Sequence, residues 1–158
     1  YGIENFARSM KDSGGSGVIT PDLTIEESHE WASAATSHEI NRIYVVAPST
    51  SDDRVSAVTS QCSGFVYAAS LMGVTGTRNS VSGDARSLVS RIRATTDLPV
   101  AVGLGVSNAE QAHEVAQYAD GVIVGSAFIR LIQESPRFAD GCARVQKLAE
   151  SLSQGVRR

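Results

Sequence analysis

The sequence has little that would mark a membrane-spanning, secreted or nucleic-acid-binding protein. None of its apolar runs reaches the ~18 residues that a membrane-spanning helix needs, and no signal peptide opens it. Its two cysteines, Cys62 and Cys142, have neither C-x-x-C spacing nor neighbouring histidines. The net charge is −3 and the Lys and Arg residues are scattered, so no basic patch for nucleic acid is expected. These absences favour a single globular, cytoplasmic domain with two reduced, buried thiols and no metal site.

The 158 residues also lack an initiating Met, because the first residue is Tyr1. A helix is predicted directly after it, since Ile3, Phe6 and Met10 fall on one helical face. No strand or helix precedes this helix in the sequence to pack against its apolar face. We therefore expect the sequence to begin inside a longer protein.

Five short apolar segments alternate with segments of helical periodicity. The predicted strands span 17–23, 42–48, 64–70, 99–105 and 121–127. Because these runs are continuously apolar, both faces of each strand are expected to be buried, as in a parallel sheet. Alternating strands and helices fit either a doubly wound open sheet or a (β/α)₈ barrel. A complete barrel takes ~250 residues and eight strands, so the strand count alone favours the open sheet.

Three helix starts are predicted from capping patterns. Thr24 to Glu27 and Ser107 to Glu110 each have the Ser/Thr-x-x-Glu pattern of a capping box, and Ser126 can cap a helix that starts near Ala127. The glycine-punctuated segment 71–83 is instead predicted to be a loop that is poorly ordered without a ligand.

The polar and glycine residues that could form a site follow the carboxyl ends of strands. Two predicted strands end on glycines. The strand 99–105 ends with Gly103 and Gly105, and the strand 121–127 ends around Gly125 and Ser126. A dinucleotide fingerprint is excluded because Asn108 stands where its third glycine would be. In (β/α)₈ proteins the loops after the last two strands and a short helix bind phosphate. The glycines therefore favour a phosphate site over the alternative that they only make tight turns.

Several segments resemble the α subunit of tryptophan synthase. The resemblance is carried by GFVYAASLMGVTGTR (64–78), by PVAVGLGVSNAEQAHEVAQYADGVIVGSAFIRLI (99–132) and, in the same order, by GVITPDL and IYVVAPSTSDDR upstream. It implies a (β/α)₈ TIM barrel, of which residues 1–158 would be a single domain holding about five C-terminal βα units, strands four to eight. The resemblance thus reverses the preference for an open sheet.

The resemblance implies a lyase of tryptophan biosynthesis. The family cleaves indole-3-glycerol phosphate to indole and glyceraldehyde 3-phosphate by a retro-aldol reaction, and passes the indole to a β subunit in a heterotetramer. The α subunit needs no cofactor, and pyridoxal phosphate is expected only in the β subunit. Residues that match the family's substrate and phosphate positions are Tyr67, Gly76, Gly103, Leu104, Gly105, Gly125 and Ser126. Thr75 matches a lid residue that supports a catalytic acid, and Asp22 matches an aspartate that communicates with the β subunit.

The two catalytic carboxylates of the family come from early strands, and no residue here matches either of them. The 158 residues alone are therefore expected to be inactive, because the acid–base chemistry needs both carboxylates. Their two sheet edges and uncovered inner face also make a stable monomer an unexpected outcome. Two alternatives remain: a non-catalytic sugar-phosphate-binding half-barrel, and another phosphate-barrel isomerase or synthase. The lid sequence argues against the second.

Overall fold

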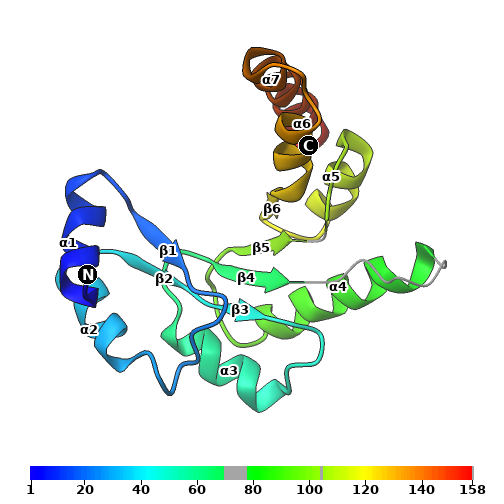
Figure 1. Cartoon of the computed structure of the whole chain (residues 1–158). Coiled ribbons are helices and arrows are strands. Elements are labelled where there is room, and N and C mark those ends of the chain that lie inside the picture. Colours follow the sequence, from blue (N-terminus) through cyan, green and yellow to red (C-terminus); the bar gives the residue numbers. More distant parts are fainter. Residues whose placement is uncertain (70–77, 104, 158) are drawn as a thin grey trace.

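A computed structural model describes residues 1–69, 78–103 and 105–157, with the side chains of 78–84 left aside. Helices and strands alternate along the chain, except at β2–β3 and α6–α7 (Figure 1). The strands are β1 (Gly17–Ile19), β2 (Asn41–Ile43), β3 (Val45–Val46), β4 (Val66–Ala69), β5 (Val100–Gly103) and β6 (Gly121–Ile123). The helices are α1 (Ile3–Asp12), α2 (His29–Ser37), α3 (Asp52–Gln61), α4 (Arg78–Arg93), α5 (Ala109–Ala116), α6 (Ser126–Gln133) and α7 (Phe138–Gly155).

All recorded strand pairs are parallel, and the strands neighbour one another in chain order. β1 pairs with β2, and a four-stranded sheet runs β3-β4-β5-β6. A doubly wound sheet reverses its strand order partway, and the described strands show no such reversal. The open sheet that the strand count favoured is therefore wrong, and the order is that of a barrel wall.

The predicted strand 42–48 is divided into β2 and β3 at Tyr44. Its first half pairs with β1 and its second half pairs with β4. Beside β2, on the side toward β4, Ser63 takes the place of a regular ladder: its hydroxyl accepts the Arg42 N–H at 3.0 Å, and its own N–H donates to the Arg42 carbonyl at 2.8 Å. These bonds satisfy the β2 backbone where β4 has not yet begun, so the two sheets are successive parts of one wall.

The main hydrophobic core lies between the four-stranded sheet and helices α3, α4 and α5. It buries Val66, Val100 and Val102 from the strands, and Leu88 and Ile92 from α4. A second, smaller core joins α1 to α2, around Ala7, Trp31 and Ala35.

The two faces of the central strands are not equally buried. In β4 and β5 every second residue is fully buried against helices, whereas Tyr67, Ala69, Ala101 and Gly103 between them are half-buried. The expectation that both faces would be buried is wrong for the described residues. The half-buried face agrees instead with the uncovered inner face expected for part of a barrel wall.

The predicted helix starts need correction. Thr24 hydrogen-bonds the Glu27 carboxylate at 2.9 Å, but this pair closes an isolated turn, and α2 starts only at His29. The second capping pattern is displaced by one residue: the Asn108 side chain accepts the Gln111 N–H at 2.9 Å.

The predicted loop 71–83 is only in part a loop. Its first seven residues lie outside the described ones, and its poor order without ligand stays a prediction. From Arg78 onward, however, the segment is already the start of α4, so the predicted loop is too long by six residues.

The thiols differ in their surroundings. Cys62 is buried, which raises the pKa of its thiol, whereas Cys142 is exposed, contrary to the expectation that both are buried. Cys142 lies on α7 beyond the main core, so its helical position and not its residue type decides its exposure.

No described helix is both long and apolar enough to cross a membrane.

Candidate functional site

The carboxyl ends of β4, β5 and β6 lie side by side and carry most of the predicted site residues. The register pairs Ala69 with Gly103 and Gly103 with Ile123 across the three strands. Tyr67 lies on β4, Gly105 follows β5, and Gly125 follows β6. The parallel pairing therefore gathers residues that are up to 58 positions apart in the sequence (Tyr67 to Gly125).

Tyr67 and Gly103 are in direct contact. A Cβ on Gly103 would lie 2.5 Å from Cε2 and 2.7 Å from Cζ of Tyr67, and closer still to its hydroxyl oxygen. The ring of Tyr67 thus lies over the bare backbone where β5 ends. The lack of a side chain at Gly103 allows this close approach of the Tyr67 ring. The alternative, that the glycines only make tight turns, does not account for Gly103.

Glycine is favoured at position 105 for a different reason, because the backbone there is left-handed. Its φ is +68°, a conformation that side-chain-bearing residues adopt at a cost. Two residues later, the N–H of Ser107 donates to Gln111 Oε1 at 2.9 Å, so the side chain of α5 holds this loop. The exposed backbone of Gly105 is therefore part of a shaped turn.

Gly125 and Ser126 form the start of α6. Gly125 is the N-cap residue, and its carbonyl accepts the N–H of Phe128 at 3.0 Å. No side-chain hydrogen bond caps this helix, so the prediction that Ser126 caps it is wrong: Ser126 is its first residue. Its hydroxyl is exposed, and a Cβ on Gly125 would meet none of the described atoms within 4 Å. The first N–H groups of a helix have no acceptor inside it, so α6 presents free donors toward open space.

Four further predicted residues are placed less fully. Thr75, Gly76 and Leu104 lie outside the described residues. Asp22 is exposed in the turn after β1. The strand order places β1 at the far end of the wall from β6, so Asp22 is not gathered with the glycine loops.

Two arginines that hold the loops after β1 and β3 were missed by sequence reasoning. Arg54 on α3 makes a two-pronged ion pair with Glu26, with one bond of 2.8 Å, and lowers the pKa of Glu26 to about 2. Arg91 on α4 bonds the Asp52 carboxylate at 2.6 Å and also contacts the carbonyls of Pro48 and Thr50. The partners are 28 to 43 residues apart, so no local sequence pattern could have indicated these contacts.

Within the described chain, no group of three or more His, Cys, Asp and Glu side chains is placed to hold a metal ion. The donors that the site residues offer at these strand ends are backbone N–H groups and the hydroxyls of Tyr67 and Ser126. Such groups suit an anion with several acceptor oxygens.

Parallel strands in chain order, with their candidate site residues at the carboxyl ends, define a segment of a (β/α)₈ barrel. The family described as "Tryptophan synthase alpha chain" matches residues 1–157. The chain belongs to this family.

Relatives and solved structures agree with this assignment over the full chain. The tryptophan synthase alpha chain of Streptomyces avermitilis is 55% identical over 157 residues, which are 99% of this chain and 57% of that protein. The alpha chain of Acidothermus cellulolyticus is 52% identical over 158 residues, 58% of its length. Tryptophan synthase of Mycobacterium tuberculosis superimposes with a TM-score of 0.87 at 46% identity, covering 100% of this chain and 58% of that one. The chain thus spans a little under three fifths of the relatives that it matches.

Proposed function

We propose that this chain is the phosphate-binding part of a tryptophan synthase alpha-type lyase that cleaves indole-3-glycerol phosphate to indole and glyceraldehyde 3-phosphate. The observation that carries the proposal is the junction of β4, β5 and β6, where Tyr67 covers Gly103 beside the uncapped start of α6. In this proposal, residues 1–158 are one domain, the C-terminal part of the barrel.

The phosphate is held by backbone and not by cations. The N–H groups of Gly105, Gly125 and Ser126, with Gly76 from the preceding loop, donate to its oxygens. The partial positive charge at the start of α6 adds to this attraction. The hydroxyl of Ser126 is exposed at that point and can donate a further bond. Fixing the phosphate orients the rest of the substrate along the inner face of the strands, against Tyr67 and Leu104.

The retro-aldol step needs one group to protonate the indole ring carbon and another to take the hydroxyl proton. Asp22 follows a strand of this chain, but it is exposed and lies at the opposite end of the strand order from the phosphate cradle. The proposal therefore gives this chain substrate binding and lid support by Thr75, and it expects no cleavage from residues 1–158 alone.

The partners proposed for the protein are the substrate and a tryptophan synthase β subunit, within a heterotetramer in the cytoplasm. The exposure of Asp22 supports its role as a contact that communicates with the β subunit. The proposal requires no cofactor in this chain, and it assigns pyridoxal phosphate to the β subunit. No nucleic acid or membrane takes part.

The test is a titration of the 158-residue chain with glycerol 3-phosphate, in which the amide NMR signals are monitored at each addition. We expect saturable shifts at Gly105, Gly125 and Ser126, and none with glycerol. Gly125→Asp, which places a carboxylate at the cradle, should weaken binding at least tenfold. Gln133→Asp adds the same charge at the other end of α6 and should leave it unchanged. Shifts centred elsewhere, or equal losses in both variants, would contradict the proposal.

A further inference from the structure

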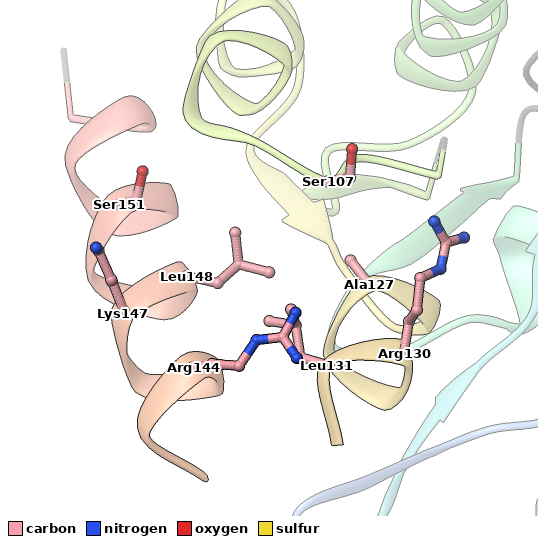
Figure 2. A pocket seen from close by; sticks show the side chains of 8 residues that line it. All are labelled: Ser107, Ala127, Arg130, Leu131, Arg144, Lys147, Leu148 and Ser151. Atoms are coloured by element: carbon pink, nitrogen blue, oxygen red, sulfur yellow. The ribbon is translucent and has the colours of Figure 1, made fainter. Parts of the chain in front are cut away.

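A cavity opens between α6, α7 and the loop that leads into α5. Its volume is about 570 Å³. The lining residues are Ser107, Ala127, Arg130, Leu131, Arg144, Lys147, Leu148 and Ser151. Figure 2 shows Leu131 and Leu148 near its middle, with Arg130 and Lys147 on opposite sides and Arg144 between the two helices. Small-molecule sites commonly have volumes of roughly 300–1,000 Å³, so this cavity is of ligand size.

The lining follows from helical spacing. On α7, Arg144, Lys147, Leu148 and Ser151 are three or four residues apart and therefore share one face. On α6, Ala127, Arg130 and Leu131 have the same relation and face them. Each helix thus presents apolar and cationic residues to the same cavity.

The charges of the cavity are not balanced by its own lining. Among the described lining residues three are cations and none is an acid. Arg144 donates to the Ser135 hydroxyl at 3.0 Å and forms an ion pair with Glu134 at 3.8 Å. Among the described residues, no ion pair is recorded for Arg130 or Lys147. Arg144 and Lys147 are also neighbours at i and i+3, where like charges repel each other. A bound anion would relieve this repulsion.

We propose that this cavity binds a small organic anion with an apolar, preferably aromatic, body. The body would pack on Ala127, Leu131 and Leu148, and its carboxylate, sulfonate or phosphate would pair with Arg144 and Lys147 on α7. An arginine can engage such a group with two parallel N–H bonds. This site is distinct from the phosphate cradle in its chemistry, because its charged groups are side chains of α6 and α7 whereas the cradle uses backbone donors.

The probe for the test is naphthalene-1-sulfonate, added to the full 158-residue chain. We expect saturable binding that shifts the methyl NMR signals of Leu131 and Leu148. The neutral naphthalene-1-methanol should bind at least tenfold more weakly, because it lacks the charge. Binding of the sulfonate should also weaken as the salt concentration rises.

Matched double variants decide which cations are responsible. Arg144→Gln with Lys147→Gln should weaken binding of the sulfonate at least tenfold. Arg8→Gln with Lys11→Gln removes the same two charges at the same spacing on α1 and should leave binding unchanged. Ser151→Trp, which narrows the cavity from α7 without removing charge, should also abolish the methyl shifts. Equal effects of the two double variants would overturn the proposal. So would shifts confined to the amides of Gly125 and Ser126, which would assign the probe to the phosphate cradle.

Discussion

The two hydrophobic cores differ in how they are built and in how they are tied together. The larger core, between β3–β6 and helices α3–α5, buries aliphatic side chains completely, with Val46, Val66, Val100 and Ile92 at 0% exposure. The smaller core of α1 and α2 leaves apolar side chains outside it, such as Phe6, which is 42% exposed although its ring lies 5.9 Å from that of Trp31. The N-terminal unit (residues 1–43) therefore holds less of the buried apolar surface that stabilises the chain.

Many of the contacts that join the two regions are polar. Arg42 of β2 donates from Nε to the Gln61 carbonyl on α3, and from one terminal nitrogen to Ala32 and Thr36 on α2. Glu26 and Arg54 add the ion pair described above. The C-terminal region (β3–α7) should therefore set the stability of the chain, and the N-terminal unit should depend on it.

The largest effect should follow from a cavity in the larger core. Leu88→Ala removes a side chain that is 1% exposed, and such substitutions cost about 2–5 kcal/mol. Urea unfolding of the chain should show a free energy of unfolding that is lower by that amount. Ile129→Ala, at a side chain that is 54% exposed, should change it by less than about 0.5 kcal/mol. Similar losses in both variants would mean that the larger core does not set the stability.

A second variant tests the half-buried inner face of the same strands. Gly103→Ala places a Cβ against the Tyr67 ring, and overpacking of this kind costs about 3 kcal/mol or less. In a Tyr67→Ala background most of this cost should vanish, because the clash is with the ring. Gly125→Ala, which meets open space among the described residues, is the control and should cost little. Additive losses from the Gly103 and Tyr67 variants would contradict the contact.

The sequence allowed most of the fold to be predicted where periodicity and burial act together. The parallel strands and their alternation with helices follow from apolar spacing. The choice between an open sheet and a barrel could not be made from the strand count, because the chain spans only part of its relatives. It came from the resemblance, and the strand order confirms it.

The site was predictable only where glycine itself carries the signal. Gly103 and Gly105 stand out in the sequence because a predicted strand ends on them, and the structure gives each a physical reason. Arg42, Arg54 and Arg91 look like ordinary helix or strand residues, because their partners are distant in the sequence. The capping patterns misplaced the helix starts by one to four residues, because Ser28, Asn108 and Gly125 are the observed N-cap residues.

Removing the side chain of Arg42 should uncouple the two regions. Arg42→Ala leaves the carbonyls of Ala32 and Gln61 without this donor, and we expect a loss of about 1–2 kcal/mol. Hydrogen exchange should rise in β1, α2 and β2 more than in β4 and β5. Arg137→Ala, which breaks only a surface ion pair with Asp140, should cost about 0–1 kcal/mol and leave exchange unchanged. A uniform rise in exchange would refute the idea that this arginine joins two regions.

The smallest effect should come from the exposed ion pair between Glu26 and Arg54, and it should depend on pH. Hydrogen bonding by Arg54 lowers the pKa of Glu26 from 4.5 to about 2. A lowered pKa means that the charged form is favoured in the folded chain, so this contribution is fully present above pH 4.5 and is lost as the pH falls toward 2. Glu26→Gln should therefore lower the melting temperature slightly near neutral pH, and the gap to the unmodified chain should close across that window. Glu150→Gln, whose carboxylate bonds only the neutral Gln146 among the described residues, should show no such window. A gap that stays constant down to pH 2 would show that Glu26 stabilises the chain by packing, and that charge does not hold the loop after β1 to α3.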